Sequence, residues 1–179
     1  CMEFEFDNRN FHALRHKEKR LLRQEIGMLF QGGALFDYLT VGENIMFPLT
    51  MFSDMSESKQ RKRAQFCLDR VNLIDAFDLL PSELSGGMIK RVAIARAIAG
   101  NRPVLLADEP TGNLDIASGK EVMKLFRELC HDEENPISIL MVTHDPDLAS
   151  NADRMLLLND GKTEASDIRS AWGLDDEDG

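Results

Sequence analysis

The amino-acid sequence predicts an α/β fold with a parallel sheet. Apolar segments at residues 26–30, 104–107 and 137–142 are continuous rather than alternating, and segments with helical patterning separate them. Continuous apolar strands joined through helices are typical of a parallel sheet that helices cover on both faces. With 179 residues, of which 43% are hydrophobic, the chain is near the size of one domain and can form one sizeable core.

The first elements are a strand and a basic helix. Residues 2–6 alternate apolar and acidic side chains, as a half-buried strand does, and residues 8–24 read as a basic helix. The short apolar run 26–30 suits a buried strand. The two glycines of the segment 31–33 predict a loop with an unusual backbone, which is a plausible functional turn.

Three helices and three more strands follow, the first of the strands at residues 104–107. The pattern of residues 56–71 predicts an amphipathic helix, residues 87–99 form a helix after a Ser-Gly-Gly turn, and a third helix precedes the strand 137–142. Asp145-Pro146 is a good cap and first-turn pair, and residues 155–158 supply the last strand. The helix 56–71 and the helix that precedes strand 137–142 each have one apolar face, which we expect to point inward. These residues are Ala64, Cys67, Leu68, Val71, Val122, Leu125, Phe126 and Leu129.

A mostly helical insertion divides the strand-rich parts of the chain. We expect residues 1–38 and 82–163 to form an incomplete core, residues 39–81 a helical subdomain, and residues 164–179 an acidic tail. The tail is either frayed or a docking peptide.

Composition and charge exclude several classes of protein. The formal charge of −10 argues against broad adhesion to nucleic acid, so the basic run at residues 9–24 is read as a solvated helix face rather than a nucleic-acid arm. We find no apolar stretch near the roughly 18 residues of a membrane span and no secretory signal. The three cysteines form no Cys-x-x-Cys pair, which fits a reducing cytosol.

Two adjacent carboxylates, Asp108 and Glu109, end the apolar strand 104–107. At the carboxyl edge of a parallel sheet, the first acid can hold Mg²⁺ and the second can activate water, on one rigid strand end. The alternative is that both acids cap the next helix. By the strand alone, the two interpretations are equally good.

A Gly-rich turn precedes the helix 87–99. Its residues 84–88 read Leu-Ser-Gly-Gly-Met, and two glycines at a helix start let backbone N–H groups approach a phosphate. Taken alone, an ordinary Gly-rich helix start is the simpler interpretation.

Five ordered motifs together resemble the nucleotide-binding domain of ABC transporters. They are similar to its Q-loop, signature, Walker B, D-loop and H-loop, found here at Gln31, residues 84–88, 105–109, 113–115 and 143–145. The matches extend across nearly the whole chain. The resemblance implies an ABC ATPase core of the P-loop NTPase kind, with ATP and Mg²⁺ as cofactors.

The resemblance also implies roles for individual residues. Asp108 and Gln31 would contact magnesium, Glu109 would be the base that polarises the attacking water, and His144 would contact the γ-phosphate. In a head-to-tail dimer, the ATP bound to a second ATPase subunit would be contacted by Ser85, Gly86 and Gly87. Asp115 would lie at the same dimer interface.

An integral-membrane permease is the other implied partner, contacted near Gln31. The apolar stretch after Gln31 fits this, and we expect Leu35, Phe36 or Met46 to be partly exposed beside it. The alternative is that these residues only pack the helical subdomain. The ATPase would then be cytoplasmic and peripheral on the inner face of the bacterial cytoplasmic membrane.

The Walker A pattern Gly-x-x-x-x-Gly-Lys-Ser/Thr does not occur in this chain. We interpret this as an N-terminal truncation, since Glu109 and His144 are intact, and expect the chain alone to be inactive. Gly119-Lys120 is read as a helix position rather than a phosphate loop. Met88 replaces the Gln that commonly ends the signature, which leaves the phosphate contacts of the serine and the backbone in place.

The amino-acid sequences of three segments, residues 30–37, 39–44 and 82–91, resemble those of the Mla-type phospholipid transport ATPases most. Residues 108–115 are more typical of lipoprotein-release and macrolide-export ATPases, so that class stays open. A catalytically silent binding module also stays open. A DNA-repair ATPase is excluded because no heptad stretch interrupts the domain.

Overall fold

The computed structural model describes residues 5–6, 9–10, 13–16, 18–19, 25–159 and 162–164. The chain divides into two compact units, Cys1–Val142 and Thr143–Gly179, and each is described by itself. In the described residues, no helix is both long enough and apolar enough to cross a membrane.

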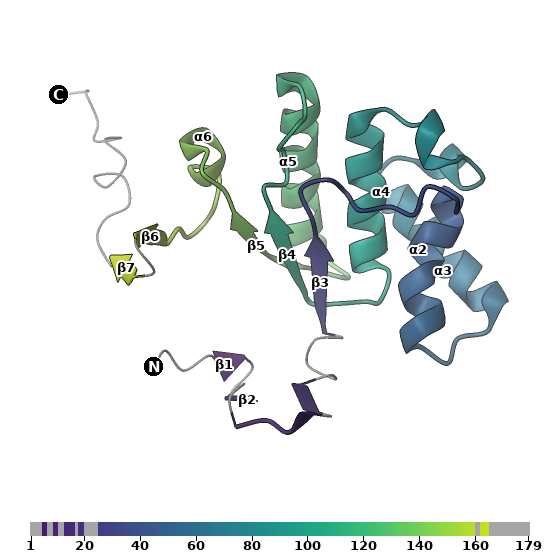
Figure 1. Cartoon of the computed structure of the whole chain (residues 1–179), viewed down its shortest axis with the longest axis horizontal. Coiled ribbons are helices and arrows are strands. Elements are labelled where there is room, and N and C mark those ends of the chain that lie inside the picture. The colour runs from purple at the N-terminus through teal and green to yellow at the C-terminus, as the bar shows by residue number, and fades with distance from the viewer. Residues whose placement is uncertain are drawn as a thin grey trace. The chain divides into compact units, whose positions relative to one another are not determined.

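A three-stranded parallel sheet forms the centre of the first unit. Its strands are β3 (Ile26–Leu29), β4 (Val104–Asp108) and β5 (Ser138–Val142), in the order β3-β4-β5. The helices α4 (Gly86–Ile98) and α5 (Ile116–Cys130) line one side of this sheet (Figure 1). The predicted α/β class is therefore confirmed, and the carboxyl ends of all three strands meet at one edge.

The two faces of the sheet differ in burial. Leu29, Leu105 and Ala107 are buried, whereas Met28 is 50% and Leu140 61% exposed. The prediction that helices cover both faces is therefore wrong for the described part of the chain. A continuous apolar strand indicates that both faces can be buried, but burial itself depends on which helices pack there.

A helical subdomain lies on the far side of α4. It contains α2 (Val41–Phe52), α3 (Glu57–Arg70) and the short 3₁₀ helices η1 (Ile74–Ala76) and η2 (Pro81–Glu83), and α2 and α3 pack on each other and on α4 (Figure 1). The predicted inward positions of α3 and α5 are all buried: Ala64, Cys67, Leu68, Val71, Val122, Leu125, Phe126 and Leu129. Both amphipathic helices are thus confirmed, while the domain boundaries stay a prediction.

Two sets of side-chain hydrogen bonds, a capping box and a buried asparagine, hold the loop that leads into α2. Thr40 and Glu43 form a capping box, in which the Thr40 hydroxyl accepts the Glu43 N–H and the Glu43 carboxylate accepts the Thr40 N–H. Asn44 is fully buried, accepts the Phe36 N–H at 2.8 Å and donates to the carbonyls of Phe36 and Leu39 at 3.1 Å. A buried amide with all these partners holds the loop in one conformation.

The beginning of the chain departs from the sequence prediction. Glu5–Phe6 (β1) pairs antiparallel with Arg9–Asn10 (β2), which confirms the end of the predicted strand 2–6 and contradicts a helix at Arg9–Asn10. Pairing with β1 satisfies the backbone there instead of helical hydrogen bonds. His16, Glu18 and Lys19 are helical, and residues 2–4, 11–12 and 20–24 lie outside the described residues.

The second unit holds α6 (Pro146–Ala149) and the antiparallel pair β6 (Leu157–Asn159) and β7 (Lys162–Glu164). Asp145 caps α6 by accepting the N–H groups of Asp147 at 2.9 Å and Leu148 at 3.3 Å, with Pro146 as the first helical residue, as predicted. The predicted strand 155–158 is confirmed at Leu157 and Leu158. The acidic tail beyond residue 164 lies outside the described residues.

Candidate functional site

Asp108 and Glu109 lie at the carboxyl edge of the sheet, where β4 ends. Asp108 is exposed beside Val142 of β5, and the Glu109 N–H continues the ladder by donating to the Val142 carbonyl at 2.9 Å. Glu109 has a φ of +43°, and its carbonyl accepts the Gly112 N–H at 3.0 Å in a tight turn. A left-handed backbone costs a non-glycine residue free energy, and such strain gathers at functional sites.

Gln31 lies against the same turn. It follows β3 by two residues and is exposed. A Cβ atom added to Gly112 would stand 2.9 Å from Gln31 Nε2 and 3.1 Å from its Cγ, so the amide side chain rests on the backbone of Gly112. The structure therefore places Gln31, which follows β3, against the turn that follows Asp108 and Glu109 at the end of β4.

Two basic residues of α4 hold the loop that follows Gln31. Lys90 Nζ donates to the Gln31 carbonyl, and Arg96 donates to the carbonyls of Gly33 at 2.8 Å and Ala34 at 2.7 Å. Burial lowers the pKa of Lys90 and of Arg96 from their ordinary values. Sequence reasoning missed these contacts. The available signal is Arg96 alone, a cation within the otherwise apolar run from Val92 to Ile98.

The signature turn and the D-loop lie side by side. Ser85 is the N-cap of α4 and accepts the Met88 N–H at 3.3 Å. A Cβ added to Gly87 would stand 3.2 Å from the Ser118 hydroxyl of α5, and one on Gly86 would contact Leu114 at 3.6 Å. Ser85 and Gly86 are exposed, so this surface, formed by residues 85–87 and the start of α5, is open to a ligand.

Asp115 is the N-cap of α5. Its carboxylate accepts the Ser118 N–H at 3.0 Å and the Ser118 hydroxyl at 2.6 Å, and these bonds hold its pKa below the ordinary value. The alternative that Asp108 and Glu109 cap the next helix is therefore wrong, because Asp115 does so. A role of Asp115 at a dimer seam stays a prediction, as its carboxylate is already engaged by Ser118.

Replacing Asp115 by Ala should destabilise the start of α5, whereas Asn, which also accepts at an N-cap, should retain most of the stability. Because the folded-state pKa is lowered, the charged form stabilises the fold above the unfolded pKa of about 3.9, and this is lost as the pH falls through the folded value. Urea midpoints at pH 7 should rank wild type, Asn, Ala, with the gap to Ala narrowing below about pH 4. Equal midpoints for wild type and Ala at pH 7 would contradict the cap.

His144 belongs to the second unit, two residues after the end of β5, and its side chain is exposed. The Thr143 hydroxyl next to it accepts the Asp145 N–H at 3.1 Å, which orders the turn into α6. The γ-phosphate role of His144 stays a prediction.

The edge suits a magnesium-bound phosphate better than a metal held by protein alone. Among the described residues there is no cluster of three or more His, Cys, Asp or Glu side chains that could hold a metal ion. Mg²⁺ at nucleotide sites needs only one or two protein ligands, because water and phosphate oxygens supply the rest. The exposed Asp108 carboxylate and Gln31 amide fit that limited role.

Comparisons with known proteins agree with this geometry. A model of the ABC transporter family matches residues 3–112. The uncharacterized ABC transporter ATP-binding protein MJ0796 of Methanocaldococcus jannaschii is 41% identical over 160 residues, which cover 88% of this chain and 66% of that protein. The macrolide export ATP-binding/permease protein MacB of Syntrophobacter fumaroxidans is 40% identical over 163 residues, 90% of this chain and 22% of MacB.

A solved structure is similar as well. It is the dimeric post-hydrolysis state of the ATP-binding cassette MJ0796 bound to ADP and Pi, with a TM-score of 0.74, 37% identity, and coverage of 89% of this chain and 69% of that one. The chain therefore belongs to the ABC transporter ATP-binding family, and its α/β fold is that of the ABC ATPases. It spans about two thirds of MJ0796 and less than a quarter of MacB.

Proposed function

We propose that this chain is part of the ATP-binding and ATP-hydrolysing subunit of an ABC transporter. The observation that supports this most is the carboxyl edge, where Gln31 rests on the turn that follows Asp108 and Glu109. Mg²⁺, when bound with ATP, would neutralise developing phosphate charge. Asp108 and Gln31 would contribute to the coordination shell of the ion. Glu109, whose backbone is hydrogen-bonded on both sides, would accept a proton from water.

His144→Ala tests the proposal in a protein that carries this chain together with a phosphate-binding loop. Loss of a donor to the γ-phosphate should lower Mg²⁺-dependent ATP hydrolysis by about 10²-fold, with ATP binding retained. The matched control is His131→Ala, because His131 is also exposed and contacts the Arg127 carbonyl near the end of α5 at 2.8 Å. Equal rates for wild type and both variants would refute the assigned role.

The class of transported substrate is proposed from the resemblance of short sequence segments to particular transporter families. The segments 30–37, 39–44 and 82–91 favour a phospholipid system of the Mla type. The MacB relatives and residues 108–115 favour a macrolide-export or lipoprotein-release system as the second candidate. Co-expression with a permease of each type discriminates them, since only the matching permease should co-purify and change the rate of ATP hydrolysis.

The permease would dock beside the loop after Gln31. Leu35, Phe36 and Met46 are all partly exposed, as predicted. The Phe36 ring packs in a tilted arrangement against those of Tyr38 and Phe47, with centroid distances of 5.9 and 4.7 Å, and Tyr38 is 77% exposed. Such an aromatic cluster suits an apolar helix of a partner. A subunit held there would be peripheral on the inner face of the cytoplasmic membrane.

Tyr38→Glu should abolish co-purification with the permease and leave the unfolding midpoint unchanged, because the side chain is mostly exposed and a charge cannot enter an apolar contact. Tyr38→Phe should retain binding. Ile74→Glu, at a site 55% exposed on η1, is the control for a charge elsewhere on the subdomain. Retained binding by Tyr38→Glu, or equal loss in Ile74→Glu, would show that the permease docks elsewhere.

A further inference from the structure

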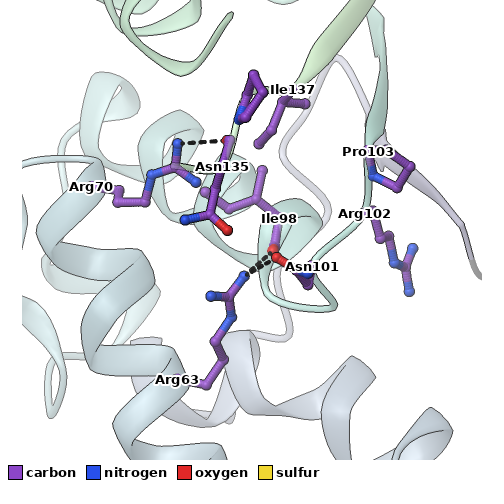
Figure 2. Close-up of a pocket in the computed structure, with 9 residues that line it drawn as sticks. Arg63, Arg70, Ile98, Asn101, Arg102, Pro103, Asn135 and Ile137 are labelled. Atoms are coloured by element: carbon purple, nitrogen blue, oxygen red, sulfur yellow. Dashed lines mark hydrogen bonds between the residues drawn. The ribbon is translucent and has the colours of Figure 1, made fainter. Parts of the chain in front are cut away.

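A cavity of about 130 Å³ lies at the edge of the sheet opposite the candidate nucleotide site. Its wall includes Pro103, which precedes β4, and Ile137, which precedes β5, so it stands at the amino ends of these strands. Figure 2 shows the guanidinium groups of Arg63 and Arg70 reaching toward this space from α3, with Asn135 between them. The site assigned to ATP uses the carboxyl ends.

Both arginines of α3 are held in place before any ligand arrives. Arg63 donates to the carbonyls of Ala99 at 2.9 Å and Ile98 at 3.1 Å, where α4 ends. Arg70 donates to Asp132 at 2.9 Å and to the Asn135 carbonyl at 3.3 Å, and its side chain is only 10% exposed. Preorganised donors lose little conformational entropy when they bind.

The cavity wall is positively charged in a chain whose net charge is −10. Its lining includes Arg63, Arg70 and Arg102 and no carboxylate. Asp132, outside the lining, offsets Arg70 alone. Backbone hydrogen bonding from Asn135, with the charge of Arg70, keeps the pKa of Asp132 low, so it stays ionised and two positive charges remain.

Donors remain free at this wall. The Nη1 groups of Arg63 and Arg70 form no hydrogen bond within the described part of the chain. Arg102 donates through Nη1 to the Ile26 carbonyl at 2.7 Å, and only its Nε is buried without a partner among those residues. Burial also lowers the pKa of Arg102. An unsatisfied buried donor costs free energy, and an anion beside it would offset that cost.

We propose that this cavity binds a small phosphate oxyanion, either free or as the end of a small phosphomonoester. Planar guanidinium forks match the oxygens of such a group, and the amides of Asn101 and Asn135 at the same wall add donors. The bound anion ties α3 to the loops that precede β4 and β5. This site is additional to the proposed ATP site.

Titration of the 179-residue chain with inorganic phosphate, at constant ionic strength set with KCl, tests the proposal. NMR signals of the Asn101 and Asn135 amides should shift and saturate. Arg70→Gln should weaken binding by about tenfold or more. Arg61→Gln is the matched control, since Arg61 is on the same helix with a side chain 61% exposed, and should bind as wild type. A parallel titration with glycerol phosphate distinguishes a phosphomonoester from the free anion as the preferred ligand.

Asn101→Gly is a second variant that tests the site even if Arg70→Gln does not fold. Asn101 has a φ of +54°, which glycine adopts freely. The change removes the amide and its 3.5 Å contact with Arg63 Nη2, and it keeps all three arginines and the bonds of Arg63 to Ala99 and Ile98. Binding should weaken several-fold while the unfolding midpoint stays near wild type. Absence of a saturable shift with both phosphate ligands, or wild-type binding by both Arg70→Gln and Asn101→Gly, overturns the proposal.

Discussion

Replacing Glu109 by Gln should lower ATP hydrolysis by about 10²–10⁴-fold in a protein that carries this chain with a phosphate-binding loop. Glutamine keeps the shape of the side chain but cannot accept a proton from water. The backbone of Glu109 is fixed by Val142 and Gly112, so the substitution leaves the turn unchanged. Phosphate release measures the rate, and a fluorescent ATP analogue measures binding, which should stay within about twofold of wild type, since only the proton acceptor is lost.

Glu128→Gln provides the matched control for this experiment. Glu128 is an exposed residue of α5 whose carboxylate pairs with Lys124 at 3.7 Å, and it takes no part in the sheet edge. Its neutralisation should leave both rate and binding unchanged. Hydrolysis by Glu109→Gln at the wild-type rate would mean that another group accepts the proton.

Gly27→Ala should destabilise the 179-residue chain by about 1–3 kcal/mol. The added Cβ would stand 2.7 Å from the Ala97 carbonyl oxygen, a contact between the backbones of β3 and α4 that neither element can relieve by a rotamer change. Relief requires the helix to move from the strand. Lys90 and Arg96 lie on the same helix, so their bonds to the loop after Gln31 should weaken as well. Urea unfolding measures the first effect and amide exchange at Gly33 and Ala34 the second.

Gly32→Ala is the internal control, because a Cβ at Gly32 would meet nothing within 4 Å. Its unfolding midpoint should match that of wild type. If Gly27→Ala and Gly32→Ala unfolded at the same urea concentration, the close approach of β3 and α4 would not contribute to stability.

The sequence was sufficient for the sheet edge because the signals there are local. Asp108 and Glu109 end an apolar strand, Gln31 follows another, and parallel strands bring their carboxyl ends together whatever the rest of the chain does. The approach of Gly86 and Gly87 to the D-loop and the start of α5 agrees with the resemblance, which implies that Asp115 lies at the same dimer interface as residues 85–87. These relations need no knowledge of which side chains meet.

The contacts that were missed depend on tertiary placement. Lys90 is buried and Arg96 half-buried because α4 packs on the loop after Gln31, and Asn44 of α2 is buried because residues 36–39 fold over it. Arg96 at least stands in an otherwise apolar run, whereas nothing in the periodicity of α2 distinguishes a buried Asn44 from a solvated one. The exposed Leu140 shows the reverse case, because an apolar strand residue stays exposed where nothing covers it.

We propose that two copies of the ATPase pair head to tail, as the family resemblance implies, and the molar mass of the Glu109→Gln protein in ATP tests this most directly. The experiment uses a protein that carries this chain together with a phosphate-binding loop. With ATP and Mg²⁺ present, light scattering should give the molar mass of a dimer. Adding Ser85→Arg, which places a bulky cation on the exposed signature turn, should give a monomer that still binds one ATP; Ser82→Arg on η2 should remain dimeric. A dimer that persists with Ser85→Arg would contradict the claim that residues 85–87 of one subunit contact the ATP of the other.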